Sequence, residues 1–402
     1  MRIRAAAVLV VATGLALAVA LTAGGAVRSS SARAAAPPII IGYSVAKTGP
    51  FQPYDGSLEN GGKIAAAAIN AKGGVLHRQI KIIDCDTKTS INNSAPCAKQ
   101  VISQGAQFVI STSDYDYGGP ALRVANSKGL VGIGFAGDTK LGYHGIGPLV
   151  FNSYQGSPAE GAVDAEFAFS KGWKKPYTLT DTINSYPKTV TDWFVKRWKE
   201  LTGKGPVGQD TFLNSDPSIA TQITGIKQAN PDVIILTSFP PGGASAIKQI
   251  RAAGINTPIV GDEAFDGSYW ISAIPGLSNV YNPKLASADG NDPSAARNAF
   301  FRAYKKFTGK ASILASYPAM GYAQVQILAR GIALAKSTNG RKVAAVISKL
   351  TSYPTLIGPT TYSWRSHCNV VSGRPFLFYQ VQNGKESFLR AWTPKHVPPF
   401  TC

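Results

Sequence analysis

The feature that most constrains the fold is a strand, loop, helix and strand that follow one another near the start of the chain. The stretch Ile39–Phe51 is typical of a strand and a Gly/Pro loop, a helix ends at Ile69–Gly74, and a second strand covers Gln79–Asp84. Parallel strands need such a helical connection, because it returns the chain to the same edge of the sheet. The pattern therefore predicts an α/β lobe here.

Residues 1–34 have the features of an export signal. Arg2 and Arg4 precede an apolar run from Ala5 to Ala23, and Ala32–Ala34 has the small-x-small form that signal peptidase cleaves after. A membrane anchor is the alternative, because the run is nearly long enough to span a bilayer. The Ala-rich run favours a cleaved signal, so we expect an exported protein, periplasmic or extracellular. No cysteine lies near the site, so we expect no lipobox lipid anchor.

The net charge is strongly basic. Residues 1–34 hold four Arg and no acid, so their removal lowers the formal charge from +19 to about +15. Nucleic acid is one partner that such a charge suggests. The Lys and Arg residues are dispersed, with only pairs such as Lys174–Lys175 and Lys305–Lys306, and no nucleic-acid motif accompanies them. A solvated basic surface is the better interpretation, and we expect no nucleic-acid partner.

The chain has four cysteines, which in an exported protein indicate two disulfides. The local solution pairs Cys85 with Cys97 and Cys368 with Cys402, although three connectivities are possible. Metal ligation is the alternative, but the cysteines form no C-x-x-C pair and the four histidines are scattered. We therefore expect neither a metal site nor a cofactor.

Short apolar strands alternate with helices over residues 39–135, and the same rhythm restarts over residues 158–260. This alternation predicts parallel sheets with helices on both faces. Three helices then follow one another within 295–349, and strands return within 360–392. Helices without intervening strands usually cover a sheet that is already built. We therefore expect the chain to cross back to the first lobe near Tyr281–Lys284 and to the second lobe near Thr355, which makes three crossings in all.

These crossings predict an α/β fold of two doubly wound parallel-sheet lobes joined by a three-strand hinge. The N-terminal lobe would hold residues 35–152 plus 285–354, and the C-terminal lobe residues 153–284 plus 355–402. A hinge between two lobes creates a cleft, which is a common place for a small-molecule site.

Several short motifs carry a resemblance to a known family. In chain order they are Thr48–Pro50, Ile69–Gly74, Asp86, Asn230–Asp232, Ala252–Gly254, Gly261–Glu263 and Gly358–Pro359. By their order and spacing the chain resembles the Leu/Ile/Val-binding family of ABC-transporter substrate-binding proteins, which have the class I periplasmic-binding fold. The resemblance covers essentially the whole chain after the signal. It implies a monomer without enzyme activity that catches a small solute and hands it to an ABC permease in the cytoplasmic membrane.

The resemblance also implies which residues hold the ligand. It places an aromatic wall at Tyr54, a ligand-facing Tyr at Tyr186, an aromatic at Phe239 and the carboxylate that binds an α-ammonium at Glu263. Tyr115 falls where a carboxylate-binding Ser is expected. The ligand-binding candidates are therefore Tyr54, Tyr115, Asp116, Gly137, Asp138, Tyr186, Phe239 and Glu263.

The acidic residues in two of these loops bear on the ligand. Asp138 stands where the family has a Thr, and Asp114 and Asp116 lie in the loop of Tyr115. Desolvated carboxylates around a ligand carboxylate would repel it by several kcal/mol. We therefore expect a neutral or amine-bearing ligand in an aromatic-lined site, and not a branched-chain amino acid. The alternative is that these aspartates are turn residues and helix caps.

Enzyme motifs are weak. Gly132–Gly137 satisfies G-x-G-x-x-G after a strand, but residues 138–145 do not open the helix that a dinucleotide site needs. Ser44 lies in a near miss for a nucleophile elbow that lacks the closing Gly. A secreted hydrolase is thus the least supported class, and a soluble sensor that presents its ligand to a membrane receptor is the alternative to a transport protein.

Overall fold

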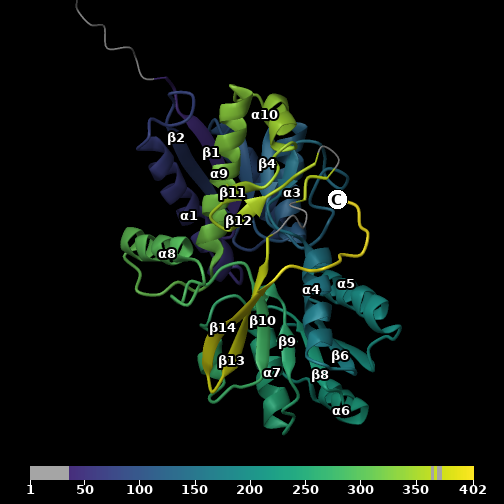
Figure 1. Cartoon of the computed structure of the whole chain (residues 1–402). Coiled ribbons are helices and arrows are strands. Elements are labelled where there is room, and N and C mark those ends of the chain that lie inside the picture. Colours follow the sequence, from purple (N-terminus) through teal and green to yellow (C-terminus); the bar gives the residue numbers. More distant parts are fainter. Residues whose placement is uncertain (1–35, 364–365, 369–373) are drawn as a thin grey trace, which may run out of the picture. The chain divides into compact units, whose positions relative to one another are not determined.

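The computed structural model describes residues 36–363, 366–368 and 374–402. Residues Ala36–Cys402 group as one compact unit (Figure 1). The expected export signal at residues 1–34 lies outside the described residues. Within the described part, no helix combines the length and the apolar composition that a membrane span requires.

The first sheet is fully parallel, with strand order β2-β1-β3-β4-β5. Its strands are β1 (Ile39–Val45), β2 (Ile80–Asp86), β3 (Phe108–Ser111), β4 (Val131–Gly134) and β5 (Val150–Asn152). β3, β4 and β5 are buried at every residue, as expected for strands covered by helices on both faces. A Cβ at Gly42 would stand 2.6 Å from Cγ2 of Val101, so glycine lets the following helix pack closely on β1.

Helices from two distant parts of the chain cover this sheet. The first set is α1 (Gln52–Asn70), α2 (Ile91–Ser103) and α3 (Tyr115–Ser127), and the second set is α8 (Ala295–Thr308), α9 (Tyr317–Ala335) and α10 (Gly340–Ile347). α9 packs along α1, and α10 reaches β4, so the late helices return to the first sheet (Figure 1). A Cβ at Gly61 or Gly321 would overlap the backbone of the facing helix, which explains the close approach of α1 and α9.

The second sheet has the order β14-β13-β10-β9-β8-β6-β7. Its strands are β6 (Pro176–Asp181), β7 (Gly208–Phe212), β8 (Val233–Thr237), β9 (Ile259–Gly261), β10 (Val280–Lys284), β13 (Phe376–Gln382) and β14 (Lys385–Trp392). The strands from β6 to β10 are parallel, and the C-terminal hairpin β13–β14 joins β10 antiparallel. The sheet is therefore mixed, with a parallel centre.

The remaining elements surround the second sheet or connect the two. They are α4 (Ser157–Ser170), α5 (Ser185–Thr202), α6 (Ala220–Ala229), α7 (Gly242–Ala252), the short 3-10 turns η1 (Glu263–Phe265) and η2 (Ile271–Ala273), and the strand pair β11 (Tyr353–Thr355) and β12 (Gly358–Thr360). The predicted α/β class with two doubly wound sheets is confirmed. The exact lobe boundaries stay a prediction.

Both disulfides have the predicted local pairing. Cys85, in β2, is joined to Cys97 in α2, and Cys368 is joined to the C-terminal Cys402. Among the described residues no cysteine is free, and no group of His, Cys, Asp and Glu side chains is arranged to hold a metal ion.

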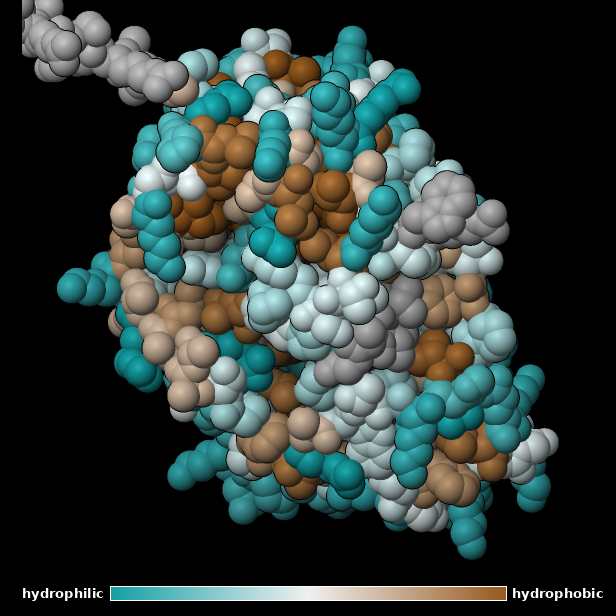
Figure 2. All heavy atoms as spheres, turned by 45° about the horizontal axis from the view of Figure 1, so that its top comes forward, coloured by the Kyte–Doolittle hydropathy of each residue, from teal (hydrophilic) through white to brown (hydrophobic). Residues whose placement is uncertain are grey.

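Acidic and basic side chains are distributed unequally between interior and surface. The buried acids are Asp55, Glu59, Asp114, Asp138, Glu160, Asp164, Glu166, Asp181, Asp262, Glu263, Asp266 and Asp292. Lys284 and Arg374 are the buried cations of the described part. Figure 2 shows hydrophilic side chains projecting over the visible face with hydrophobic patches between them. The interior is therefore more acidic, and the exterior more basic, than the composition suggests.

Candidate ligand-binding site

A cavity lies where the carboxyl ends of strands from both sheets meet. The first sheet contributes Phe51 after β1, Ser113 and Asp114 after β3, Phe135, Ala136 and Gly137 after β4, and Tyr154 after β5. The second sheet contributes Tyr186 in α5, Phe239 after β8, and Glu263 and Ala264 after β9, while α9 adds Tyr317. Carboxyl edges of parallel sheets are the usual ligand sites of α/β folds.

The cavity is small in this structure. Its volume is about 20 Å³, which holds about one water molecule. A solute of amino-acid size therefore enters only if the lining moves. Because the lining comes from both sheets, the two sheets would have to separate and close again around the solute.

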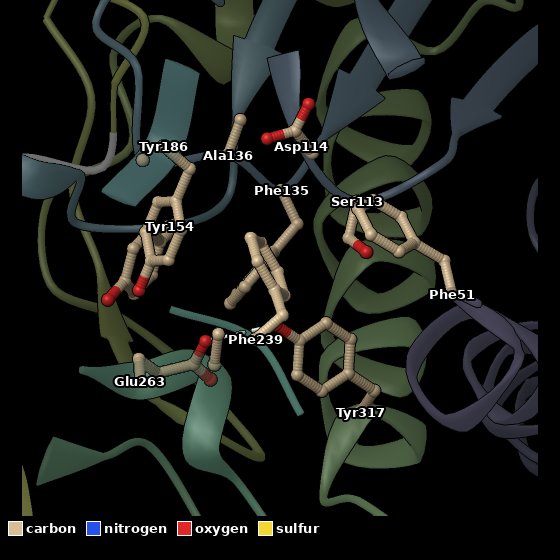
Figure 3. A pocket seen from close by; sticks show the side chains of 12 residues that line it. Phe51, Ser113, Asp114, Phe135, Ala136, Tyr154, Tyr186, Phe239, Glu263 and Tyr317 are labelled. Atoms are coloured by element: carbon tan, nitrogen blue, oxygen red, sulfur yellow. Dashed lines mark hydrogen bonds between the residues drawn. The ribbon is translucent and has the colours of Figure 1, made fainter. Parts of the chain in front are cut away.

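Six aromatic rings surround the cavity, and we call them the aromatic cage: Phe51, Phe135, Tyr154, Tyr186, Phe239 and Tyr317 (Figure 3). Phe51 stacks on Phe239 with ring centroids 5.3 Å apart, which joins the two sheets directly. Phe135 contacts Tyr154 at 4.6 Å and Tyr317 at 5.2 Å. Each such pair adds about 0.5–1.5 kcal/mol beyond the buried area, so the cage is a defined structure.

The tyrosine hydroxyls of the cage all donate hydrogen bonds to carboxylates. Tyr154 and Tyr186 donate to Glu160 at 2.8 and 2.9 Å, and Tyr317 donates to Oε2 of Glu263 at 2.9 Å. Burial raises the pKa of each tyrosine well above its usual value, so the hydroxyls keep their protons. Glu160 also accepts from the Glu263 N–H at 2.6 Å, which makes it the centre of this network.

Two carboxyl groups of the lining each keep one oxygen unpaired. Glu263 is 2 % exposed and Asp114 is 6 % exposed, and neither Oε1 of Glu263 nor Oδ2 of Asp114 has a hydrogen-bond partner among the described residues. Burial, followed by the nearby carboxyls of Asp266 and Glu160, raises the pKa of Glu263 well above its usual range. Burial and the neighbouring Asp116 raise the pKa of Asp114 to about 8. Unpaired buried acceptors are costly unless a ligand supplies a donor.

The polar donors at the first sheet are already engaged. The N–H and hydroxyl of Ser113 both donate to Oδ1 of Asp55, at 3.0 and 2.6 Å, and the Ala136 N–H donates to Asn152 at 3.1 Å. Burial raises the pKa of Asp55 to about 7, although the bonds from Ser113 act in the opposite direction. The carboxyl group of Asp55 therefore holds both donors of Ser113, which a ligand carboxylate would otherwise use.

Half of the sequence-derived candidates line the cavity: Gly137, Tyr186, Phe239 and Glu263. Tyr54 lies directly behind them, since its ring packs at 5.1 Å from Tyr317 and 6.0 Å from Phe239, and its hydroxyl donates to the Ala264 carbonyl at 2.7 Å.

Tyr115 and Asp116 do not reach the cavity. Asp114 has a φ of 89° and caps α3 by accepting from the Asp116 and Tyr117 N–H groups, so the chain turns away before Tyr115. The Tyr115 hydroxyl contacts Arg123 at 2.7 Å. Oδ2 of Asp116 accepts from the Ser185 N–H at 2.8 Å and thereby joins α3 to the start of α5.

Asp138 is also outside the cavity lining. Its Oδ1 accepts from the Lys140 N–H at 2.8 Å, and its Oδ2 lies 3.7 Å from the Lys140 Nζ. The structure thus gives Asp138 the part of a turn residue and Asp114 that of a helix cap, which is the alternative reading of these aspartates.

Several lining residues were missed by sequence reasoning. Ser113 and Phe135 directly follow strands, so the rule that ligands gather at carboxyl ends of parallel strands would have found them. Tyr154 follows β5, a strand of three residues that is too short to show alternation. Tyr317 begins α9, and no local signal marks a helix that returns from so far along the chain.

Comparison with known proteins places the chain among binding proteins. A family model described as periplasmic binding protein matches residues 38–386. The Leu/Ile/Val-binding protein homolog 3 of Brucella melitensis is 23 % identical over 360 residues, which cover 88 % of this chain and 94 % of the relative. The Leu/Ile/Val-binding protein of Escherichia coli is 24 % identical over 248 residues, 61 % of this chain and 66 % of the relative.

Solved structures show the same fold. A branched-chain amino acid transporter substrate binding protein from Streptococcus pneumoniae, in complex with isoleucine, has a TM-score of 0.75 at 21 % identity over 88 % of this chain and 99 % of that one. An ABC-transporter solute binding protein from Rhodopseudomonas palustris, in complex with benzoate, has a TM-score of 0.73 at 19 % identity over 89 % and 97 %. The family match spans nearly all of the chain after residue 37, and the chain belongs to the periplasmic binding protein family.

Proposed function

We propose that this protein captures a small solute in the aromatic cage, outside the cytoplasmic membrane, and delivers it to an ABC importer. The solute has an aromatic or apolar body and is neutral or carries an amine. The observation that carries the proposal is a cavity built from the carboxyl ends of strands in both sheets. A solute held there contacts both sheets at once, so binding is coupled to closure.

The solute class follows from the cage. Six rings offer a large apolar contact area, and no described residue of the lining is basic. The names of similar proteins support a solute of this size, since one is described in complex with isoleucine and another with benzoate. Delivery to an importer is supported by the same names, because one describes a substrate binding protein of a branched-chain amino acid transporter and the other a solute binding protein of an ABC transporter. A location outside the cytoplasm is supported by the periplasmic binding protein family match.

A binding protein is proposed rather than an enzyme, because the relatives are named for the solutes they bind. The hydrogen bonds of the cavity agree with a role in binding. The cage hydroxyls and Ser113 hold neighbouring carboxyl groups of the protein itself. These bonds fix the geometry of a closed binding site.

A thermal-shift screen of the chain from residue 35 onward tests the proposal, with amino acids, amides, amines and aromatic acids as probes. A bound solute raises the melting temperature, because it binds the folded state only. Phe239→Ala removes the ring that stacks on Phe51 and is expected to weaken the affinity for any hit about tenfold, or about 1.4 kcal/mol. The matched control is Phe307→Ala, since Phe307 is 52 % exposed.

The proposal fails if no probe changes the melting temperature, or if Phe239→Ala binds the hit as tightly as Phe307→Ala does. Delivery is tested separately by the uptake of the labelled hit into cells with and without the gene. Uptake that is restored by the wild-type chain but not by Phe239→Ala supports delivery. Uptake that does not depend on the gene contradicts it.

A further inference from the structure

We infer that the solute is an organic cation without a carboxylate, held with its positively charged nitrogen group among the rings of the aromatic cage and against the free oxygen of Glu263. This inference rests on the proposed function and narrows its solute class. It follows from three independent properties of the cavity: its charge, its used donors and its unused acceptors.

The charge around the cavity is one-sided. Glu263 and Asp114 line it, and Glu160 and Asp55 lie directly behind, bonded to the cage tyrosines and to Ser113. Within the part of the chain that the structure describes, no residue of the lining is basic. Lys284 is fully buried, but it pairs with Glu386 at 2.6 Å and lies 3.9 Å from Asp266. An anionic solute would thus be desolvated among carboxyl groups, whereas a cation favours the ionised form of these groups and is then attracted by it.

The side-chain donors of the described lining, which a ligand carboxylate would otherwise use, are already engaged inside the protein. The three cage tyrosines donate to Glu160 and Glu263, and Ser113 donates twice to Asp55. The Ala136 N–H donates to Asn152. A zwitterionic amino acid would place its carboxylate against engaged donors, which costs about the desolvation penalty of a buried charge that lacks partners.

Two acceptor atoms of the lining, in contrast to these donors, are unused. Oε1 of Glu263 and Oδ2 of Asp114 are buried and without a partner among the residues described. The hydrogen bond from Tyr317 to Oε2 fixes the Glu263 carboxyl group, and in Figure 3 this group lies below Tyr154 and Tyr186. A nitrogen group with an N–H satisfies the free oxygen and brings a charge opposite to that of Glu263.

The rings favour a cation over a neutral body of the same shape. A cation over an aromatic face gains about 0.5–2 kcal/mol, and the larger values belong to desolvated sites. Hydroxyls that donate to carboxylates place additional negative charge on the Tyr154, Tyr186 and Tyr317 rings. Alkylated nitrogen groups are weakly hydrated, so they lose little when they enter such a cage. Protonated amines with an apolar body, which keep an N–H for Glu263, are therefore the expected solutes, and a quaternary ammonium ion would be held by the rings and by charge alone.

Isothermal titration calorimetry with matched pairs of probes tests the inference. Leucine is compared with isopentylamine, and phenylalanine with phenethylamine, because each amine differs from its amino acid only by the carboxylate. Choline is compared with 3,3-dimethylbutan-1-ol, which replaces the charged nitrogen by carbon. We expect at least one amine to bind, at least tenfold more tightly than its amino acid, and any binding of choline to exceed that of the alcohol.

The inference is overturned if an amino acid binds as tightly as its amine, or if a simple carboxylate such as benzoate is the tightest probe. Either result would leave the proposed solute binding intact but would refute the inference that the solute is a cation. If no amine, amino acid, carboxylate or other probe binds at all, the proposed function fails as well. Glu263→Gln separates the charge from the shape of the site and should weaken amine binding at least tenfold, whereas Asp192→Asn, at an exposed acid of α5, should leave it unchanged.

Discussion

Replacing Glu263 by glutamine should have opposite effects on ligand binding and on the stability of the ligand-free protein. The amide keeps an oxygen that can accept from Tyr317 at 2.9 Å, so the shape of the cage is preserved. The substitution removes the charge and the charge-assisted hydrogen bond to the solute. Such a bond contributes about 1.5–3 kcal/mol, against about 1 kcal/mol for a neutral one. A loss of about 2 kcal/mol corresponds to an affinity about thirtyfold weaker.

The stability of the ligand-free protein should change in the other direction. Oε1 of Glu263 is buried without a partner among the described residues. An unpaired buried polar group costs about 1–3 kcal/mol, and a charged one costs more than the neutral amide that replaces it. Because the pKa of Glu263 is raised above its value in the unfolded chain, the folded state binds the proton more tightly. Protonated Glu263 therefore contributes stability that is fully present below the unfolded pKa. This stability is lost as the pH rises through the folded pKa.

The side chain of the Glu263→Gln variant does not titrate. The variant should therefore be as stable as the wild type near pH 5 and more stable than the wild type near pH 8. Urea unfolding at both pH values measures this difference, and calorimetry measures the amine affinity. Asp192→Asn controls for the loss of one negative charge at an exposed position. The reasoning is refuted if Glu263→Gln binds the amine as the wild type does, or if the variant is less stable than the wild type at pH 8.

Three further predictions concern the surroundings of the site. Asp138→Asn should change the amine affinity less than twofold in calorimetry, because this carboxyl group contacts Lys140 and not the cavity. A tenfold loss of affinity would show that Asp138 takes part in binding. Gly137→Val should weaken binding at least tenfold, since a Cβ would overlap the Tyr186 ring and the Ser157 hydroxyl and keep the sheets apart; unchanged affinity would show that closure does not bring these groups together. Replacing Cys368 and Cys402 by serine should lower the free energy of unfolding by about 4 kcal/mol, as the loop of 34 residues is released; an unchanged urea midpoint would contradict this.

The fold was predictable because its signals are local and repeated. Alternation of apolar strands and helices over residues 39–135 and 158–260 reflects strands that are buried on both faces, such as β3 and β8. The disulfide pairing was predictable for a similar reason, since each bridge closes a short loop. What alternation did not show is the pairing of the β13–β14 hairpin with β10, which depends on contacts between distant segments.

The site was only partly predictable, because it depends on the directions in which individual side chains point. Glu263 and Phe239 follow strands, and their positions along the chain place them at the carboxyl edge. Tyr115 and Asp138 lie in loops at the same edge, yet the left-handed conformation of Asp114 and the turn at Asp138 direct them elsewhere. The use of Ser113 by Asp55 depends on a hydrogen bond between β3 and α1 that no sequence pattern encodes.

The most direct test is a calorimetric comparison of leucine with isopentylamine on the wild-type chain at pH 8. The two probes share the apolar body and the ammonium, so the difference in affinity reports the carboxylate alone. We expect isopentylamine to bind at least tenfold more tightly, because the side-chain donors of the described lining are engaged and its unpaired side-chain atoms are carboxyl oxygens. Leucine that binds as tightly as isopentylamine, or more tightly, would contradict this expectation.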